Sequence, residues 1–107
     1  MPNKWEIWLA KVKFEDEPNK VKERPVLVIS PEQCFILSFK ITSHKPRYND
    51  RLDYPIKKWA EVGLQKQSTI RISKLLQLIK KDFTHKIGRL HPIDILAVIK
   101  ILQNSKK

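Results

Sequence analysis

Two apolar segments separated by three residues constrain the fold of this chain most strongly. Residues 25–30 read PVLVIS and residues 34–42 read CFILSFKIT, and both are rich in the β-branched and aromatic residues that favour strands. The first segment is apolar on both faces, as a central strand is, and the second alternates apolar residues from Phe35 to Ile41. We therefore predict that the two segments pair as a hairpin, with a turn at residues 30–33, and carry the core.

Shorter patterns around this hairpin predict further strands. Strands are expected at residues 5–14, 68–79 and 86–90, although the second half of residues 68–79 also suits a helix. Polar loops are expected at residues 15–23 and 43–53, because both hold proline and asparagine and break the apolar pattern.

Residues 55–64 are expected to form a short helical turn. Ile56, Trp59 and Ala60 would face inward, and Gly63 would end the turn in the left-handed conformation.

The chain closes with an amphipathic helix, expected at residues 91–102. Pro92 suits the first helical position, and Asp94 suits the positive end of the helix dipole. The apolar stripe expected to pack across the sheet consists of Ile95, Leu96, Ile99 and Leu102.

Several short strands and a closing helix predict a small, strongly curved sheet or barrel of the α+β or mainly β class. A chain of 107 residues has room for one core, which buries roughly two thirds of the unfolded surface. One domain over residues 1–107 is therefore expected.

The charge balance indicates a polyanionic partner. The chain holds 22 Lys and Arg against 11 Asp and Glu, a formal net charge of +11. Nucleic acid is the leading candidate, with an anionic membrane or an acidic protein behind it. The two glycines exclude a phosphate-binding Gly-rich loop. No segment suits a membrane span or a signal peptide, so a cytoplasmic protein is expected.

Residue types that bind metals are few and scattered. Cys34 lies in an apolar segment and is expected to be a buried filler, and His44, His85 and His91 lack metal-ligand spacing. The acidic run at residues 15–17 is expected to stay hydrated. No metal site is predicted.

Three tryptophans stand among lysines, as they do on surfaces that stack unpaired bases. Trp8 and Trp59 are expected to pack in the core. For Trp5, core packing and base stacking both remain open.

Arg24 and Thr42 stand at the ends of the two hairpin segments. Because the far ends of a hairpin meet at one rim of the sheet, we expect the guanidinium and the hydroxyl to meet there. A guanidinium can bind two oxygens of a phosphodiester, and a hydroxyl can orient the same group. The structural alternative is an arginine that caps loop carbonyls beside a threonine suited to a strand.

His44 follows Thr42 in a cationic loop. It is a candidate acid or base near neutral pH, with an ordinary surface histidine as the alternative. His91 is expected to mark the start of the helix.

Five segments in order resemble the MazF/PemK toxins of type II toxin-antitoxin systems. They are IWLAKVKFED, KERPVLVIS, FKITS, YPIKKWAEVGLQKQSTIRISKL and KIGRL, and together they span nearly the whole chain. The resemblance implies a small SH3-like barrel of the MazF/CcdB type, with short helical segments and a C-terminal helix, that works as a homodimer.

The same resemblance implies an endoribonuclease that cuts single-stranded RNA, such as mRNA, without a metal or other cofactor. The products would be a 2′,3′-cyclic phosphate and a 5′-hydroxyl. The catalytic arginine and threonine of the family correspond to Arg24 and Thr42, and Arg71 matches a basic strand position used at the scissile phosphate. The expected RNA-binding residues flank these positions: Lys20, Lys22, Ser43, Lys45 and Arg47.

A mechanism consistent with both lines has the ribose 2′-hydroxyl attack the adjacent phosphorus. Arg24 and Arg71 would stabilise the charged phosphorane and Thr42 would position it, with His44 as the base or with no base at all. Family members often carry an acidic residue where this chain has Ser73, and Gly-Asp where it has Trp5 and Glu6.

Three functions remain open from the sequence. The first is an RNA-cleaving toxin whose basic groove also binds an acidic antitoxin tail. The second is a noncatalytic RNA-binding barrel, and the third is a protein-interaction module that holds an acidic segment.

Overall fold

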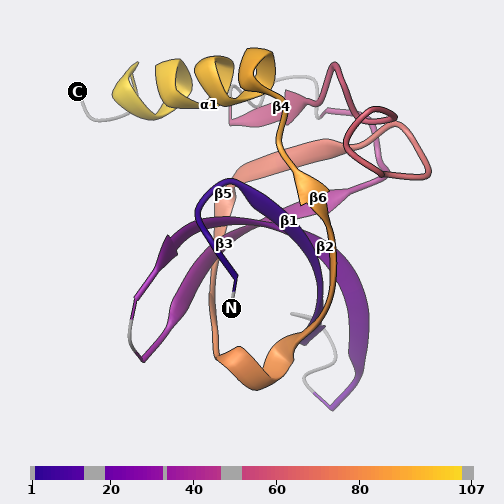
Figure 1. Ribbon diagram of the computed structural model, residues 1–107, viewed down its shortest axis with the longest axis vertical. Coiled ribbons are helices and arrows are strands. Elements are labelled where there is room, and N and C mark those ends of the chain that lie inside the picture. The colour runs from indigo at the N-terminus through magenta and orange to yellow at the C-terminus, as the bar shows by residue number, and fades with distance from the viewer. Residues whose placement is uncertain (1, 14–18, 33, 47–51, 105–107) are drawn as a thin grey trace.

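The computed structural model describes residues 2–13, 19–32, 34–46 and 52–104. Their backbone forms one antiparallel sheet, a 3-10 turn and a C-terminal helix (Figure 1). In chain order the elements are β1 (Glu6–Lys13), β2 (Val21–Pro31), β3 (Ile36–Thr42), β4 (Asp53–Pro55), β5 (Thr69–Leu78), η1 (Lys80–Asp82), β6 (Phe83–Arg89) and α1 (Pro92–Asn104).

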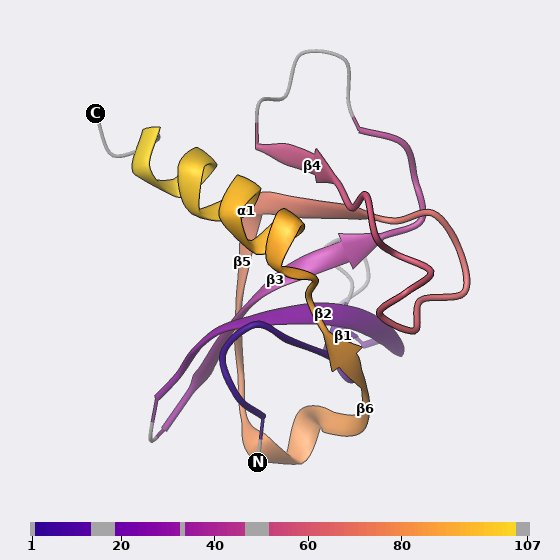
Figure 2. The ribbon, with the colours of Figure 1, turned by 45° about the horizontal axis from the view of Figure 1, so that its top comes forward.

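The sheet is six-stranded over the described residues, with the order β4-β5-β3-β2-β1-β6. It is strongly curved, and α1 lies across one end of it (Figures 1 and 2). No pairing of the described residues joins β4 to β6, so the sheet does not close. The α+β class is as predicted, whereas the SH3-like barrel is not confirmed.

The predicted hairpin of two central strands is confirmed. β2 and β3 pair antiparallel, with Leu27 opposite Phe39, and they occupy the middle of the strand order. Val26 and Leu27 are both fully buried but belong to different core clusters, because successive side chains of a strand point to opposite faces. β2 is therefore buried on both faces, as its apolar composition indicates.

The predicted start of this strand is wrong. β2 begins at Val21, so Arg24 lies within the strand, opposite Ala10 of β1, and does not stand at its end. β2 pairs with β1 over residues 21–27 but with β3 only from Val26 onward. Pro25 is tolerated inside the strand because this part of β2 has a paired neighbour on one side only.

The predicted alternation in the second segment is correct only in its second half. Phe39 and Ile41 are buried, whereas Phe35 is exposed and Ile36 is buried instead. β3 begins at Ile36, so Phe35 lies before the strand and outside the paired part of the sheet. Cys34 precedes β3 and is exposed, so the prediction of a buried cysteine is also wrong.

The segment between β4 and β5 differs from the predicted helical turn. Residues 57–63 form successive turns without a helix, Ile56 is buried, and Ala60 is exposed rather than inward-facing. Gly63 has a φ of +98°, which confirms the left-handed position expected for it. β5 runs as a strand from Thr69 to Leu78, so the helical alternative for the second half of residues 68–79 is wrong.

The two glycines of the chain bring this segment against β6. A Cβ on Gly63 would lie 2.9 Å from the carbonyl oxygen of Ile87, and one on Gly88 would lie 2.3 Å from that of Val62. The close backbone approach requires glycine on both sides. It places residues 63–66 along one side of the sheet.

The closing helix is confirmed, and its buried face is the predicted one only in part. Pro92 is its first residue, and Val98 and Asp94 are its buried side chains, whereas Leu96 is 66% exposed. Among the residues of the predicted stripe, Ile95 and Leu102 pack against the main core.

The buried face of α1 includes Asp94 because hydrogen bonds hold the Asp94 carboxylate on the side of the helix that faces the core. It accepts hydrogen bonds from the Tyr54 hydroxyl at 2.6 Å and from the backbone N–H groups of Lys57 and Lys58 at 3.0 Å each. Burial raises the pKa of Tyr54, and the hydrogen bond to Asp94 and its negative charge raise it further. The phenol therefore remains a donor.

The tryptophans are all half-buried. Trp59 packs against the main core as predicted, and Trp5 does so too. Trp8 meets Phe83 edge to face, with ring centroids 6.0 Å apart.

Candidate active site

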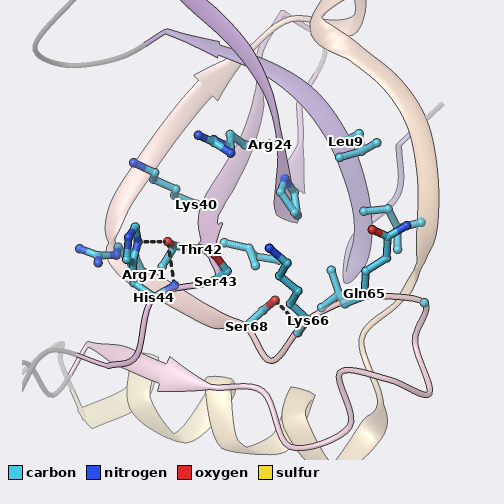
Figure 3. Close-up of a pocket in the computed structure, with 15 residues that line it drawn as sticks. Leu9, Arg24, Lys40, Thr42, Ser43, His44, Gln65, Lys66, Ser68 and Arg71 are labelled. Carbon is cyan, nitrogen blue, oxygen red and sulfur yellow. Dashed lines mark hydrogen bonds between the residues drawn. The ribbon is translucent and has the colours of Figure 1, made fainter.

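A cleft of about 680 Å³ opens between β2, β3 and β5 on one side and residues 63–66 on the other (Figure 3). The residues that line it are Leu9, Arg24, Pro25, Lys40, Ile41, Thr42, Ser43, His44, Gly63, Leu64, Gln65, Lys66, Ser68, Arg71 and Ile87.

The cleft brings together the residues that the sequence singled out as candidates. Arg24, Thr42, His44 and Arg71, the four candidate catalytic residues, all line it, and so does Ser43.

The other candidate RNA-binding residues lie elsewhere. Lys20, Lys22 and Lys45 are exposed and do not line the cleft, and Arg47 lies outside the described residues.

Strand register explains why these side chains meet. Lys40 of β3 pairs with Val26 of β2 and with Arg71 of β5, so these three residues form one row across the sheet. Thr42, two residues further along β3, pairs with Thr69 of β5, and Arg24 lies two residues before Val26 on β2. Cross-strand neighbours in a sheet share a face.

The cleft is cationic. Arg24, Lys40, Lys66 and Arg71 line it, and none of the described lining residues is acidic. In Figure 3, Lys66 extends from the opposite side toward the strands that carry the other cations. Four cations around one hollow favour an anionic ligand such as a phosphate backbone.

One hydrogen-bond donor of Arg71 has no partner among the described residues. Its Nε is buried and has no hydrogen-bond partner among the described residues. A buried donor without a partner costs roughly 1–3 kcal/mol, which a bound oxyanion would recover. The guanidinium fork suits two oxygens of one phosphate.

Thr42 and His44 are hydrogen-bonded to each other. Oγ1 of Thr42 lies 2.8 Å from Nδ1 of His44, and the backbone N–H of His44 donates to the same oxygen at 3.3 Å. The hydroxyl of Thr69 donates to the His44 carbonyl at 2.9 Å, which anchors the segment after β3 to β5. The pair therefore has a fixed place beside the cationic residues.

Apolar side chains complete the lining. Leu9, Pro25, Ile41, Leu64 and Ile87 come from four strands and the turn before β5. A hollow lined by both cations and apolar side chains suits an unpaired nucleotide, whose phosphate is charged and whose base has an apolar face.

Sequence reasoning missed Lys40, Gln65, Lys66 and Ser68. Lys40 could have been found, because it stands two residues before Thr42 and therefore faces the same side of β3. The other three gave no signal, since they are brought to the cleft by the turns between β4 and β5 and by the glycine contact with β6.

The described residues offer no group of three His, Cys, Asp or Glu side chains that could hold a metal ion. In the same residues, no helix has the length and apolar character needed to cross a membrane.

Comparisons with known proteins connect this chain to one family. A family model described as "PemK-like, MazF-like toxin of type II toxin-antitoxin system" matches residues 3–105. No curated protein matches the chain.

Solved structures with the same fold include three toxins or endoribonucleases. The Mycobacterium tuberculosis toxin MazF-mt6 is 21% identical, with 92% of this chain and 93% of that chain covered and a TM-score of 0.72. An endoribonuclease in complex with its cognate antitoxin, from a Mycobacterial species, is 11% identical, with 97% and 93% covered and a TM-score of 0.74. A further Mtb toxin is 19% identical, with 92% and 97% covered and a TM-score of 0.67. At these identities the matches establish the fold.

Proposed function

This chain belongs to the PemK-like, MazF-like toxins of type II toxin-antitoxin systems, and we propose that it is an endoribonuclease that cuts single-stranded RNA. The observation that carries the proposal is the cationic cleft in which Arg24, Thr42 and Arg71 lie together. The single domain proposed to carry the activity is the whole chain, residues 1–107.

The proposed reaction is attack of the ribose 2′-hydroxyl on the adjacent phosphorus. Negative charge builds on the phosphoryl oxygens as the new bond forms, and Arg24 and Arg71 neutralise it. Guanidinium keeps its proton below roughly pH 12, so both arginines act as charge stabilisers rather than proton donors. The mechanism requires no metal ion, because the arginines supply the positive charge.

Thr42 is proposed to orient the reacting nucleotide. Its hydroxyl is fixed by two hydrogen bonds to His44 at the end of β3. Holding the attacking oxygen in line with the leaving oxygen can lower the barrier by several kcal/mol, roughly 7 or more in the best-oriented intramolecular reactions.

We also propose that the protein has the SH3-like barrel of the family. Contacts other than the strand pairings of the described residues would close this barrel.

A cognate antitoxin is the proposed protein partner. An acidic tail in the cleft would meet the same four cations that are proposed to meet RNA, and would compete with it. We also propose a homodimer, by analogy with the family, and the cytoplasm as the place of action, because the proposed substrate is mRNA.

Cleavage of an end-labelled single-stranded RNA in the presence of EDTA tests the proposal. We expect the protein to cut the RNA with the chelator present, and Arg24→Ala to lower the rate by about 10²-fold or more while the variant keeps the wild-type circular dichroism spectrum and Tm. Lys100→Ala, on the exposed face of α1, is the matched control and should cut as the wild type does.

Two results would contradict the proposal. RNA that binds but remains whole would identify a noncatalytic RNA-binding protein. RNA that neither binds nor is cut, with tight binding of an acidic peptide, would identify a protein-interaction module.

A further inference from the structure

The Thr42 hydroxyl and the His44 ring form the contact drawn as a dashed line in Figure 3. A hydroxyl has one proton to donate and two lone pairs that accept. The backbone N–H of His44 uses one lone pair of Oγ1. If the Thr42 proton is donated to Nδ1, the second lone pair is left to accept a hydroxyl of a ligand in the cleft.

We propose that Thr42 and His44 form a proton relay, with His44 as the general base of the reaction; this rests on the function proposed above. In the resting protein the neutral imidazole carries its proton on Nε2 and accepts the Thr42 O–H at Nδ1. The ribose 2′-hydroxyl donates to the second lone pair of Oγ1.

The proton transfers balance in this scheme. As the 2′-oxygen attacks phosphorus, its proton passes to Oγ1 and the Thr42 proton passes to Nδ1. The O2′–P bond forms, the P–O5′ bond breaks, and the 5′-oxygen takes a proton from water. The imidazolium then returns its extra proton to water, which leaves a 2′,3′-cyclic phosphate and a 5′-hydroxyl.

The composition of the cleft favours His44 for this role. Among the described residues that line the cleft, His44 is the one side chain that can take up a proton near neutral pH. The charged groups that share the cleft with it are Arg24 from β2, Lys40 from β3, Arg71 from β5 and Lys66 from the turn before β5, and all are cations. No carboxylate of the described lining can act as the base.

The position of His44 suits both steps of the relay, which are the uptake of the proton from Thr42 and its release to water. Thr69 is 2% exposed, and its hydroxyl donates to the His44 carbonyl at 2.9 Å and holds the backbone in place. The residue itself is exposed to solvent, so the proton that the ring takes up can leave to water. Thr69 is therefore a positioning residue for the relay.

The pH dependence of single-turnover cleavage tests the relay. For the wild type we expect the rate to rise with pH to a plateau, because only the neutral imidazole can accept a proton. His44→Gln keeps an acceptor for the Thr42 hydroxyl but no base, so its rate should fall by about 10²-fold or more and lose that rise. His85→Gln, an exposed histidine on β6, is the matched control and should retain both the rate and the profile.

A second measurement reports on the pair without any cleavage. ¹⁵N NMR of the histidine side chains above pH 8 should show the Nε2–H tautomer for His44, and Thr42→Val should alter its Nδ1 shift. An Nδ1–H tautomer would overturn the relay. So would a His44→Gln variant that cuts with the wild-type rate and pH profile, and this result would leave the proposed function intact. A folded wild-type protein that cuts no RNA would overturn the proposed function as well.

Discussion

The surroundings of a residue in this molecule determine its chemical behaviour more than its amino-acid type does. Arg24 is exposed within a strand, whereas Arg71 is half-buried and keeps its Nε away from water. Outside the cleft, Glu6 shows this effect of the surroundings most clearly. It is buried and accepts hydrogen bonds from the Asn3 N–H at 2.8 Å and the Trp8 ring N–H at 3.0 Å, and it pairs with Lys86 at 2.8 Å.

Glu6 is expected to make the protein sensitive to acid. Burial by itself raises the pKa of this carboxyl, but the hydrogen bonds from Lys86, Trp8 and Asn3 and the charge of Lys86 lower it from 4.5 to about 2. Because the folded-state pKa is depressed, the stabilisation is fully present above pH 4.5 and is lost as pH falls through about 2. At neutral pH, Glu6→Gln should cost about 2 kcal/mol, less than the whole shift implies because Lys86 is half exposed.

Urea unfolding of the wild type and Glu6→Gln between neutral and acid pH measures this effect. The difference in unfolding free energy should shrink as the pH is lowered from 4.5 toward about 2. Glu61→Gln is the control, because its contacts with Lys58 and His91 lie at the surface and contribute little. An equal difference at all pH values would contradict the account.

At the scale of elements, the cleft depends on two contacts that fix the segment between β4 and β5. One is the approach of Gly63 and Gly88, which sets residues 63–66 against β6. The other is the buried Asp94 carboxylate of α1, which binds Tyr54 of β4 and the backbone after it. The Asp94 contact lies outside the cleft, whereas Gly63 itself lines it, and both contacts support one of its sides.

The glycine contact is tested by Gly88→Ala. The added Cβ would lie 2.3 Å from the backbone oxygen of Val62, which cannot rotate away as a side chain can. We expect a loss of about 2–3 kcal/mol in unfolding free energy and a lower rate of RNA cleavage, because the wall that carries Lys66 must shift. His85→Ala on the same strand should leave both nearly unchanged. An unaltered Tm for Gly88→Ala would show that the approach is looser than described.

The Asp94 contact is tested by Tyr54→Phe. This change removes a donor from a buried carboxylate and should destabilise the protein by about 1–3 kcal/mol in urea unfolding. Because the two side chains are bonded at 2.6 Å, the effects of Tyr54→Phe and Asp94→Asn should not add in the double variant. Additive effects would contradict a direct contribution from this hydrogen bond.

The elements that the sequence predicts well are those with local signals. The hairpin of β2 and β3 and the start of α1 at Pro92 follow from apolar runs and from proline chemistry. The presence of Arg24 and Thr42 in one cleft follows from the pairing of that hairpin, even though Arg24 lies inside the strand. Because this register depends on the hairpin alone, the central part of the cleft could be foreseen.

Features set by distant contacts could not be foreseen. The inward turn of Asp94 depends on Tyr54, and the exposure of Cys34 depends on where β3 begins. Lys66 reaches the cleft only because β6 carries Gly88 opposite Val62. No local pattern of residues signals any of these contacts.

At the scale of the whole molecule, the charge favours a polyanionic ligand. The net charge of +11 is carried by a body of 31 × 31 × 29 Å, and part of it is gathered around one cleft. A compact, strongly cationic surface attracts RNA by releasing counterions, whatever the sequence of the RNA. In the proposed reaction, the geometry of the cleft then decides which linkage is cut.

Binding to 2′-O-methyl RNA, which lacks the attacking hydroxyl, should weaken steeply with salt. For a single strand, the slope of log affinity against log salt falls by about 0.7 for each phosphate that the protein no longer neutralises. Lys40→Gln and Lys66→Gln should each reduce the slope by about this amount, whereas Lys100→Gln on α1 should not. A slope that stays the same in both cleft variants would place the RNA elsewhere.

The most direct test of the account is to replace a single oxygen in the substrate. Once the cut site in an RNA has been mapped, the nucleotide 5′ of the cut is replaced by its 2′-deoxy form, and binding and cleavage are measured in EDTA. The account predicts that this oligonucleotide binds with nearly the affinity of the parent RNA and remains uncut at that linkage. Cleavage there at the parent rate would show that the ribose hydroxyl is not the nucleophile and would contradict the mechanism.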